Sequence, residues 1–368
     1  MNYRVILVER NVDMLSHMAG TLKADDSFDL ASTYRDADMA LGQSSVFRPN
    51  LFLIDVDEPR AVELIGNFVR DYPQAQVIGL MENWKPDRAE RVISAGGCGC
   101  IIKPFSIAEI LGALAIYRRR GKALPTRTIA FFSPKGHSGR TTLATVMAIE
   151  LAKKSGEAVA VIDADLQFGD VAMFFDAVTE RNVVEAAHDI RLLTPATLEG
   201  YFHPLGHNVW IMGGSLQPEH AELVETDQLI DVVRMAGNLF RYVLLDLPAG
   251  FNPISLALAE YADTDILVSM ISSGQEVRHV KRSLKMFHMW DNYGKKIYTI
   301  FTNVQNCTGD HQKKLESELG RHVTKILPVE RRITEVTGSG RLMKDLPERT
   351  PFVQAVAEFA DEMVSGRR

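Results

Sequence analysis

The amino-acid sequence predicts an α/β protein of two domains, each built on a doubly wound parallel sheet. Apolar runs of strand length alternate with amphipathic stretches of helix length along the 368 residues, which is the pattern of successive βαβ units. A basic segment with a glycine and a proline, residues 118–127, interrupts this alternation and indicates a domain boundary. We therefore expect a first domain over residues 1–120, a linker over 121–127 and a second domain over 128–368.

Five expected strands make up the first domain. They cover residues 4–8, 28–32, 51–54, 77–80 and 99–102. Amphipathic stretches such as residues 14–23 and 61–71 separate them, as helices do between the strands of a parallel sheet. Five such strands complete a small doubly wound domain of the flavodoxin-like type.

The second domain is expected to contain seven strands. They cover residues 129–133, 158–162, 209–212, 242–245, 266–270, 297–301 and 322–327. Near the end of the chain, Phe352, Val356 and Phe359 recur at helical spacing within residues 351–364, a stretch that has acids and few cations. This composition favours a helix packed on the protein's own core over a helix that lies on a membrane.

Composition limits the kind of protein. The hydrophobic fraction of 46%, the charged fraction of 24% and the net charge of −6 are ordinary for a soluble protein and give no general attraction to nucleic acid. Three cysteines, Cys98, Cys100 and Cys307, are too few for a disulfide framework and lack a second pair at metal-ligand spacing. We expect a cytoplasmic protein with no transmembrane segment and no specific nucleic-acid partner.

Residues 129–142 are the most informative stretch of the chain. An apolar run stops at Ser133, a short loop contains Gly136 and Gly139, and a helical pattern begins at Thr141. A strand, a tight loop of backbone N–H groups and a helix N-terminus together form a phosphate-binding P-loop. The expected phosphate-binding residues are Lys135, Gly136, His137, Ser138, Gly139, Arg140, Thr141 and Thr142.

Acidic residues follow two further apolar runs. Asp163 and Asp165 come directly after one expected strand, and Asp246 ends another. The carboxyl ends of parallel strands lie along the same sheet edge as the P-loop, where ligands bind in open α/β sheets. Acids at this edge can hold a Mg²⁺ shell or orient an attacking water. The three segments together predict a nucleotide site.

At these residues the chain resembles the ParA/MinD family of deviant Walker-A ATPases, whose loop is Lys-Gly-Gly-x-Gly-Lys-Thr-Thr where this chain has residues 135–142. The resemblance implies ATP and Mg²⁺ as cofactors, with Thr141 and Asp246 as metal ligands. It also implies that Lys135 reaches the phosphates held by the second subunit of a homodimer. Lys135 and Asp246 are thus candidate catalytic residues.

Other positions match the same family. Asp163 and Asp165 correspond to its first switch, where an aspartate helps to place the attacking water, and both are candidate catalytic residues. Thr142 corresponds to the residue beside the α-phosphate. The resemblance further implies that Asn303 contacts the adenine and that Pro328 begins the segment that closes over the base.

Two positions depart from the family's loop. His137 replaces a glycine that could take a positive φ, and histidine adopts that conformation only with strain. Arg140 replaces the loop lysine and keeps the positive charge on a bulkier, planar group. We expect nucleotide binding to be retained and hydrolysis to be weak or absent. A degenerate loop that binds nothing is the alternative.

The first domain resembles a two-component receiver. Asp55 ends the third apolar run, where receivers carry the phosphoacceptor, and Lys103 precedes Pro104 as in the receiver Lys-Pro pair. The acidic pair that holds Mg²⁺ in receivers is reduced to Glu9 followed by Arg10, whose charge opposes metal binding. We expect a pseudo-receiver used for docking or dimerisation, and a phosphorylated switch is the alternative.

A pseudo-receiver fused to a deviant Walker-A ATPase resembles the CpaE/TadZ family of pilus-assembly proteins, which residues 163–172 resemble in particular. The resemblance implies an ATP-dependent homodimer that places type IVb/Tad pilus and secretion machinery at a cell pole. Its partners would be proteins of that machinery, and peripheral membrane association stays open.

Three other functions remain alternatives. A ParA-like partitioning ATPase could bind DNA nonspecifically through Arg331, Arg332 and residues 341–344. A MinD-like membrane-binding regulator would need an amphipathic terminal helix. A true response regulator would use the ATPase as its output.

Overall fold

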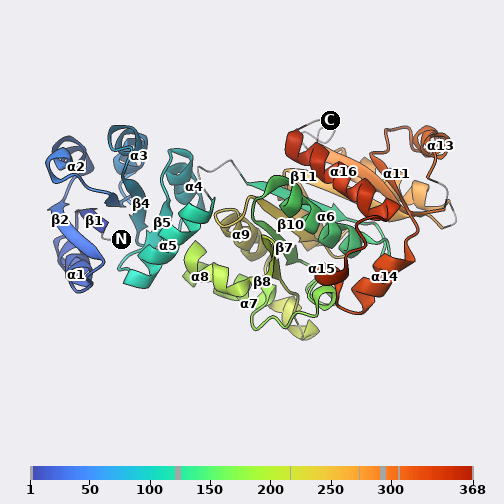
Figure 1. Ribbon diagram of the computed structural model, residues 1–368, viewed down its shortest axis with the longest axis horizontal. Helices are drawn as coiled ribbons and strands as arrows, with labels where there is room; N and C mark the ends of the chain where they lie inside the picture. Colours follow the sequence, from blue (N-terminus) through green and yellow to red (C-terminus); the bar gives the residue numbers. More distant parts are fainter. Residues whose placement is uncertain are drawn as a thin grey trace. The chain divides into compact units, whose positions relative to one another are not determined.

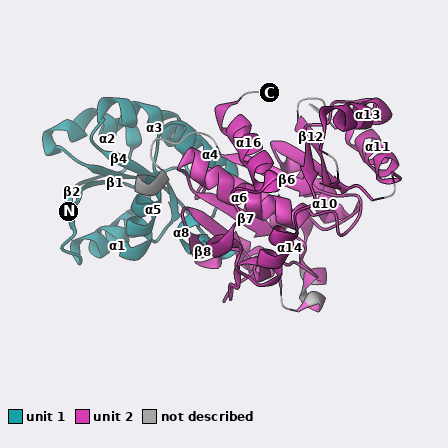
Figure 2. Ribbon diagram, turned by 45° about the vertical axis from the view of Figure 1, so that its right-hand side comes forward, with its two compact units in different colours: residues 1–124, 191–199 teal, residues 125–190, 200–368 magenta. Residues whose placement is uncertain are grey.

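Two separate sheets organise the chain and confirm the predicted α/β architecture (Figure 1). The computed structural model describes residues 3–120, 126–215, 217–272, 274–290, 296–305 and 307–366. The chain divides into two compact units, coloured separately in Figure 2. Unit 1 contains residues 1–124 and 191–199, and unit 2 contains residues 125–190 and 200–368.

Unit 1 is a five-stranded parallel sheet in the order β2-β1-β3-β4-β5. Its strands are β1 (Tyr3–Val8), β2 (Phe28–Tyr34), β3 (Leu51–Asp55), β4 (Gln76–Met81) and β5 (Gly99–Ile102). The helices between and after them are α1 (Val12–Lys23), α2 (Ala37–Gln43), α3 (Pro59–Asp71), α4 (Pro86–Ser94) and α5 (Ile107–Arg120). Each strand lies where the apolar runs predict it.

Helices cover both faces of the unit 1 sheet. In β3, Leu51 and Leu53 pack with residues of α1 and α5, whereas Phe52 and Ile54 pack with residues of α2, α3 and α4. Side chains of a strand alternate between faces, so a strand buried on both sides is apolar throughout. The sheet is therefore doubly wound, and its polar groups gather where the strands end.

Unit 2 is built on an eight-stranded sheet in the order β13-β12-β11-β6-β10-β7-β9-β8. Its strands are β6 (Arg127–Phe132), β7 (Val159–Asp163), β8 (His203–Gly206), β9 (Val209–Met212), β10 (Tyr242–Asp246), β11 (Thr264–Met270), β12 (Ile297–Val304) and β13 (Lys325–Pro328). Its longer helices are α6 (Arg140–Ser155), α7 (Val183–Asp189), α9 (Thr226–Ala236), α10 (Pro253–Tyr261), α11 (Glu276–Phe287), α13 (Gly309–Leu319), α14 (Arg331–Gly338) and α16 (Pro351–Ser365).

The sheet differs from the prediction at its two edges. The edge strand β8 runs antiparallel to β9 and was not predicted, because Pro204 and Gly206 lie within it; an edge position tolerates both residues. The opposite edge strand, β13, begins at Lys325 and not at 322. The N–H of Val323 donates to the Glu316 carboxylate at 3.0 Å, so the chain there is held by a side chain.

The C-terminal helix α16 packs on the core of unit 2, as its composition predicts. Phe352, Val356, Phe359 and Met363 are buried in one cluster with α6 and the central strands, and Figure 1 shows α16 alongside α6. Among the described residues, no helix is both long and apolar enough to cross a membrane.

A close contact links the segment after β7 to the C-terminal helices. Gly340 lies between α14 and the short helix α15 (Leu342–Asp345) and has a φ of 68°. A Cβ at this position would come within 2.7 Å of the Cβ of Asp176, at the end of a 3₁₀ turn over Met173–Phe175. The two segments are thus packed backbone to backbone.

One carboxylate in unit 2 is buried far from any expected site. Asp265 of β11 is fully buried, and its nearest cation, the Lys296 ammonium, lies 3.5 Å from Oδ2. That ammonium also donates to the carbonyls of Ala259 and Glu260, each at 2.6 Å. Burial raises the pKa of Asp265 to about 8, although Lys296 opposes the shift.

This carboxylate predicts a pH-dependent stability. A carboxyl pKa that is higher in the folded protein means that folding favours the protonated form, so Asp265 lowers stability progressively from about pH 4 to pH 8. Asp265→Asn should therefore raise the free energy of unfolding by about 4 kcal/mol more at pH 8.5 than at pH 5. Urea unfolding at both pH values measures this, with the exposed Asp361→Asn as control. An equal effect at the two pH values would contradict it.

Candidate functional site

The P-loop connects β6 to α6 in unit 2. Lys135, Gly136 and His137 are exposed, Ser138 is buried, and Gly139, with a φ of 78°, is the residue before the helix. His137 has a φ of 57°, so this histidine takes the left-handed conformation that a glycine would adopt freely. His137 thus adopts the positive φ for which the sequence comparison expected a glycine, at some cost in strain.

Hydrogen bonds hold the loop to the sheet. The Ser133 hydroxyl donates to the Lys135 carbonyl at 2.7 Å, and the Gly250 N–H donates to the Ser133 carbonyl at 2.8 Å. From the end of β12, the Thr302 hydroxyl donates to the Ser138 carbonyl at 2.6 Å. The loop is therefore fixed from two sides before any ligand binds.

Arg140, the first residue of α6, turns toward the sheet. Its Nε donates to Oδ1 of Asp246 at 2.6 Å, and its Nη2 lies 3.6 Å from Oδ2 of Asp165. Asp246 is fully buried at the end of β10, and its Oδ2 accepts a hydrogen bond from the Thr141 hydroxyl at 2.6 Å. Burial raises the pKa of Asp246, and the Arg140 charge and the Thr141 bond oppose that rise.

Asp163 lies beside Asp246, because the two residues are paired in register on β7 and β10. It is fully buried and accepts hydrogen bonds from the N–H groups of Asp165, at 3.2 Å, and Val171, at 3.1 Å. Burial and the neighbouring Asp246 raise the pKa of Asp163 well above its usual range. Asp163 shapes the loop after β7, whereas Asp165 lies nearer the surface.

The residues assigned to the base lie at the same edge of the sheet. Asn303 is the second-last residue of β12 and has a φ of 58°. Its Nδ2 donates to the Ile271 carbonyl at 3.2 Å. Pro328 ends β13 and is paired with Val304 of β12. The sheet thus brings Asn303, Pro328 and Thr302, which is hydrogen-bonded to the P-loop, to its carboxyl edge. The contact with the base itself stays a prediction.

Mg²⁺ was expected at Thr141 and Asp246, and the surroundings of Asp246 do not favour direct binding of that ion. A hydroxyl and a carboxylate are suitable ligands, but both oxygens of Asp246 are engaged, one of them by a cation. Among the described residues, no group of three or more His, Cys, Asp or Glu side chains is arranged to hold a metal ion. Asp246, as it stands, is therefore not free to bind a divalent ion directly, whereas the Thr141 hydroxyl keeps its oxygen lone pairs.

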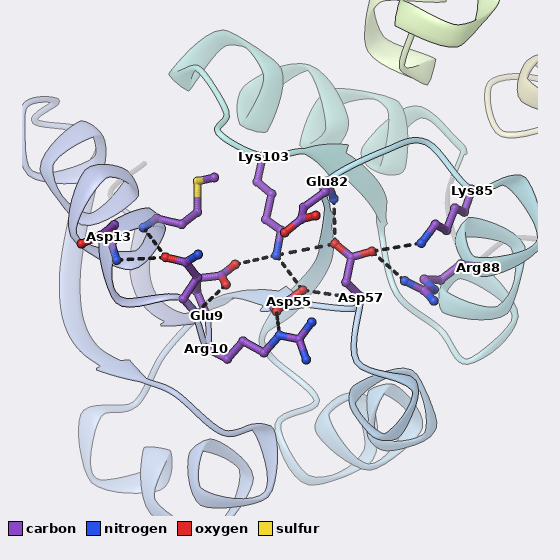
Figure 3. A network of polar contacts seen from close by, with 11 residues as sticks. Glu9, Arg10, Asp13, Asp55, Asp57, Glu82, Lys85, Arg88 and Lys103 are labelled. Carbon is purple, nitrogen blue, oxygen red and sulfur yellow. Dashed lines mark hydrogen bonds and ion pairs between the residues drawn. The ribbon is translucent and has the colours of Figure 1, made fainter.

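In the receiver-like site of unit 1, a lysine of the chain also lies between the acidic side chains and offsets their charge. Figure 3 shows the Lys103 side chain reaching between Glu9 and Asp55; its Nζ lies 2.7 Å from Oε2 of Glu9 and 2.8 Å from Oδ1 of Asp55. All three side chains are buried. Burial lowers the pKa of Lys103, but the hydrogen bonds to Asp55 and Glu9 outweigh it and the net pKa is raised. The three predicted residues therefore form one cluster.

Sequence reasoning missed part of this cluster. Asp57 lies 3.6 Å from Lys103 Nζ and accepts a hydrogen bond from Arg88 at 2.7 Å, with Lys85 at 3.7 Å. Arg10 lies 3.8 Å from Asp55, as its position beside Glu9 suggested. A single residue, Val56, separates the two aspartates after β3, and that spacing was the signal for Asp57. Three acids and four cations thus meet at this sheet edge.

The cluster gives a stability prediction for unit 1. Lys103→Met removes the buried ammonium that Glu9 and Asp55 share and leaves the exposed Arg10 as a more distant cation for Asp55. Losing one partner of a buried ion pair typically costs about 3 kcal/mol or more. Lys85→Met is a matched control, because Lys85 is exposed and its ion pair contributes at most about 1 kcal/mol. Urea unfolding should show a large loss for the first variant and a small one for the second. Equal losses would mean that Lys103 does not hold the cluster together.

The loop after β7 gives a second prediction. Gly169 lies so close to the Asp163 carboxylate that a Cβ at 169 would overlap its atoms, whereas a Cβ at Gly136 would meet nothing within 4 Å. Because Asp163 is buried and held by two N–H groups, it cannot move aside cheaply. Gly169→Ala should lower the free energy of unfolding by about 1–3 kcal/mol, and Gly136→Ala by much less. Thermal unfolding of both variants decides, and similar melting temperatures would contradict the close packing.

Comparisons with known proteins agree with this geometry. A family model of the CobQ/CobB/MinD/ParA nucleotide binding domain matches residues 129–343, more than half of the chain. An uncharacterised ATP-binding protein of Methanocaldococcus jannaschii is 27% identical over 245 residues, which are 65% of this chain and 88% of that protein.

Solved structures share the fold of unit 2. A ParA family ATPase from Chlorobium tepidum is similar with a TM-score of 0.59 and 18% identity, over 64% of this chain and 98% of the other. The septum site-determining protein MinD from Pyrococcus horikoshii, complexed with Mg-ADP, has a TM-score of 0.54 and 20% identity, over 65% and 96% of the two chains. Given the family match over its P-loop and both acidic strand ends, this chain belongs to the CobQ/CobB/MinD/ParA family of nucleotide-binding domains.

Proposed function

We propose that this protein is an ATP-binding factor that dimerises around its nucleotide and places pilus-assembly machinery of the CpaE/TadZ type. The observation that carries the nucleotide part is the P-loop itself, fixed by Thr302 and Gly250 and lined by Asp165 and Asp246 at one sheet edge. ATP is the nucleotide named for the Methanocaldococcus relative. The pilus part rests on the resemblance of the whole two-part arrangement, a receiver-like sheet followed by a ParA/MinD-like domain.

Lys135 is the residue proposed to join two subunits. It is exposed on the P-loop, next to the exposed Gly136 and His137, so its ammonium can reach a phosphate held by another copy. Dimerisation would then create a surface for a partner protein, which is how nucleotide binding would control localisation.

Hydrolysis is proposed to be weak. Asp246, one of the candidate catalytic acids, is engaged by Arg140 and Thr141, and Asp163 is committed to the backbone of its own loop. A group stabilises the charge of a transition state only when its charge or hydrogen-bond donors are directed at the reacting atoms. The protein would therefore act through the bound state of the nucleotide more than through turnover.

The receiver-like unit is proposed to act as a docking or dimerisation module and not as a phosphorylated switch. Asp55 is buried and shares the Lys103 ammonium with Glu9, while Arg10 lies on its other side. A phosphoryl group on Asp55 would need its charge neutralised at a place where the cations already serve three acids. This supports a constant surface whose shape does not depend on modification.

Sedimentation velocity with and without ATP tests the proposal. ATP should shift the wild-type protein toward a dimer, whereas Lys135→Ala should stay monomeric while still binding ATP. Lys154→Ala, an exposed lysine near the end of α6, is the matched control and should dimerise like the wild type. The proposed mechanism fails if wild-type protein saturated with ATP, as shown by calorimetry, remains a monomer.

A further inference from the structure

The position of Arg140 sets this P-loop apart from one that carries lysine. The side chain is 9% exposed, and its Nε, the nitrogen nearest the backbone in the guanidinium, donates to Oδ1 of Asp246 at 2.6 Å. A lysine has a methylene at that position and its ammonium one bond further out, so it cannot make this bond. The contact is therefore specific to arginine.

The charges around Arg140 explain why it turns inward. Asp246 is fully buried, and the carboxylate of Asp165 lies 3.6 Å from Nη2 of the same guanidinium. A buried carboxylate is stable only when a cation or several hydrogen bonds compensate it. Arg140 supplies that positive charge from within the chain, and Thr141 supplies the second hydrogen bond to Asp246.

We propose that Arg140 takes the place of a divalent cation in this site, so that the protein binds a nucleoside triphosphate as the free anion and without dependence on Mg²⁺. This inference rests on the proposed nucleotide binding and adds the form in which the ligand is bound. The guanidinium has five N–H donors, and its hydrogen bond to Asp246 uses the one on Nε. The remaining donors, the exposed Lys135 and the backbone N–H groups of the loop provide the positive charge for the phosphates.

The same contact disfavours the metal. A dication that used Asp246 would have to lie next to the guanidinium that already holds this carboxylate, and two cations at such a distance repel each other strongly in a buried site. Arg140 would have to leave Asp246 before a metal could bind there. A lysine at 140 removes the bond from Nε and frees Asp246 to act as a metal ligand.

Calorimetric titration of the full-length chain with ATP, in excess MgCl₂ and in excess EDTA, tests the proposal. The wild-type dissociation constant should differ by no more than about threefold between the two conditions. Arg140→Lys should bind ATP more than about tenfold less tightly in EDTA than in MgCl₂. The exposed Arg341→Lys, the same substitution elsewhere in the unit, should behave like the wild type.

The outcomes separate this inference from the proposed function. Wild-type binding that weakens more than about tenfold in EDTA overturns the metal-independent site and leaves ATP binding standing. An Arg140→Lys variant that is as insensitive to EDTA as the wild type removes Arg140 from that role. No ATP binding by the wild type in either condition overturns the proposed function and this inference together. The wild-type comparison needs no variant, so it decides even if Arg140→Lys folds poorly.

Discussion

The buried carboxylate of Asp246 is the contact on which the nucleotide site depends. It ends the central strand β10, lies between β6 and β7, and is bound by the first two residues of α6. A charge removed from water must be compensated by fixed partners, so the start of α6 is tied to the sheet by the need to neutralise this one group. The P-loop from Ser133 to Gly139 is thus held at both ends: at Ser133 by the Gly250 N–H, and at the start of α6 by the bonds of Arg140 and Thr141 to Asp246.

Both units solve the same electrostatic problem with their own cations. Parallel strands bring acids to the carboxyl edge of each sheet, at Asp55 in unit 1 and at Asp246 in unit 2. In many folds of this kind a metal could balance such acids. Here Lys103 and Arg140 do so from within the chain, and both are buried. Each buried carboxylate thus has a cation of the chain itself beside it.

Much of this arrangement follows from local sequence pattern, and the remainder depends on tertiary contacts. Strands buried on both faces are apolar throughout, so β3 and β10 could be located, and the P-loop follows from its glycines and its place after β6. The edge strand β8 was missed because Pro204 and Gly206 disfavour a strand except at an edge, which sequence alone does not reveal. Arg140 turns inward because Asp246 is buried, which the sequence does not reveal. Asp57 and Arg88 are 31 residues apart in the chain, so their pairing follows only from the tertiary fold.

The backbone contact between Gly340 and Asp176 has a mechanical consequence. The loop that Asp163 and Asp165 shape continues into the turn at Met173–Phe175, which leaves no room for a side chain at 340. A rigid stop of this kind transmits displacement without needing a change in bonding. A rearrangement of that loop that moves the turn toward Gly340 would therefore also displace the junction between α14 and α15.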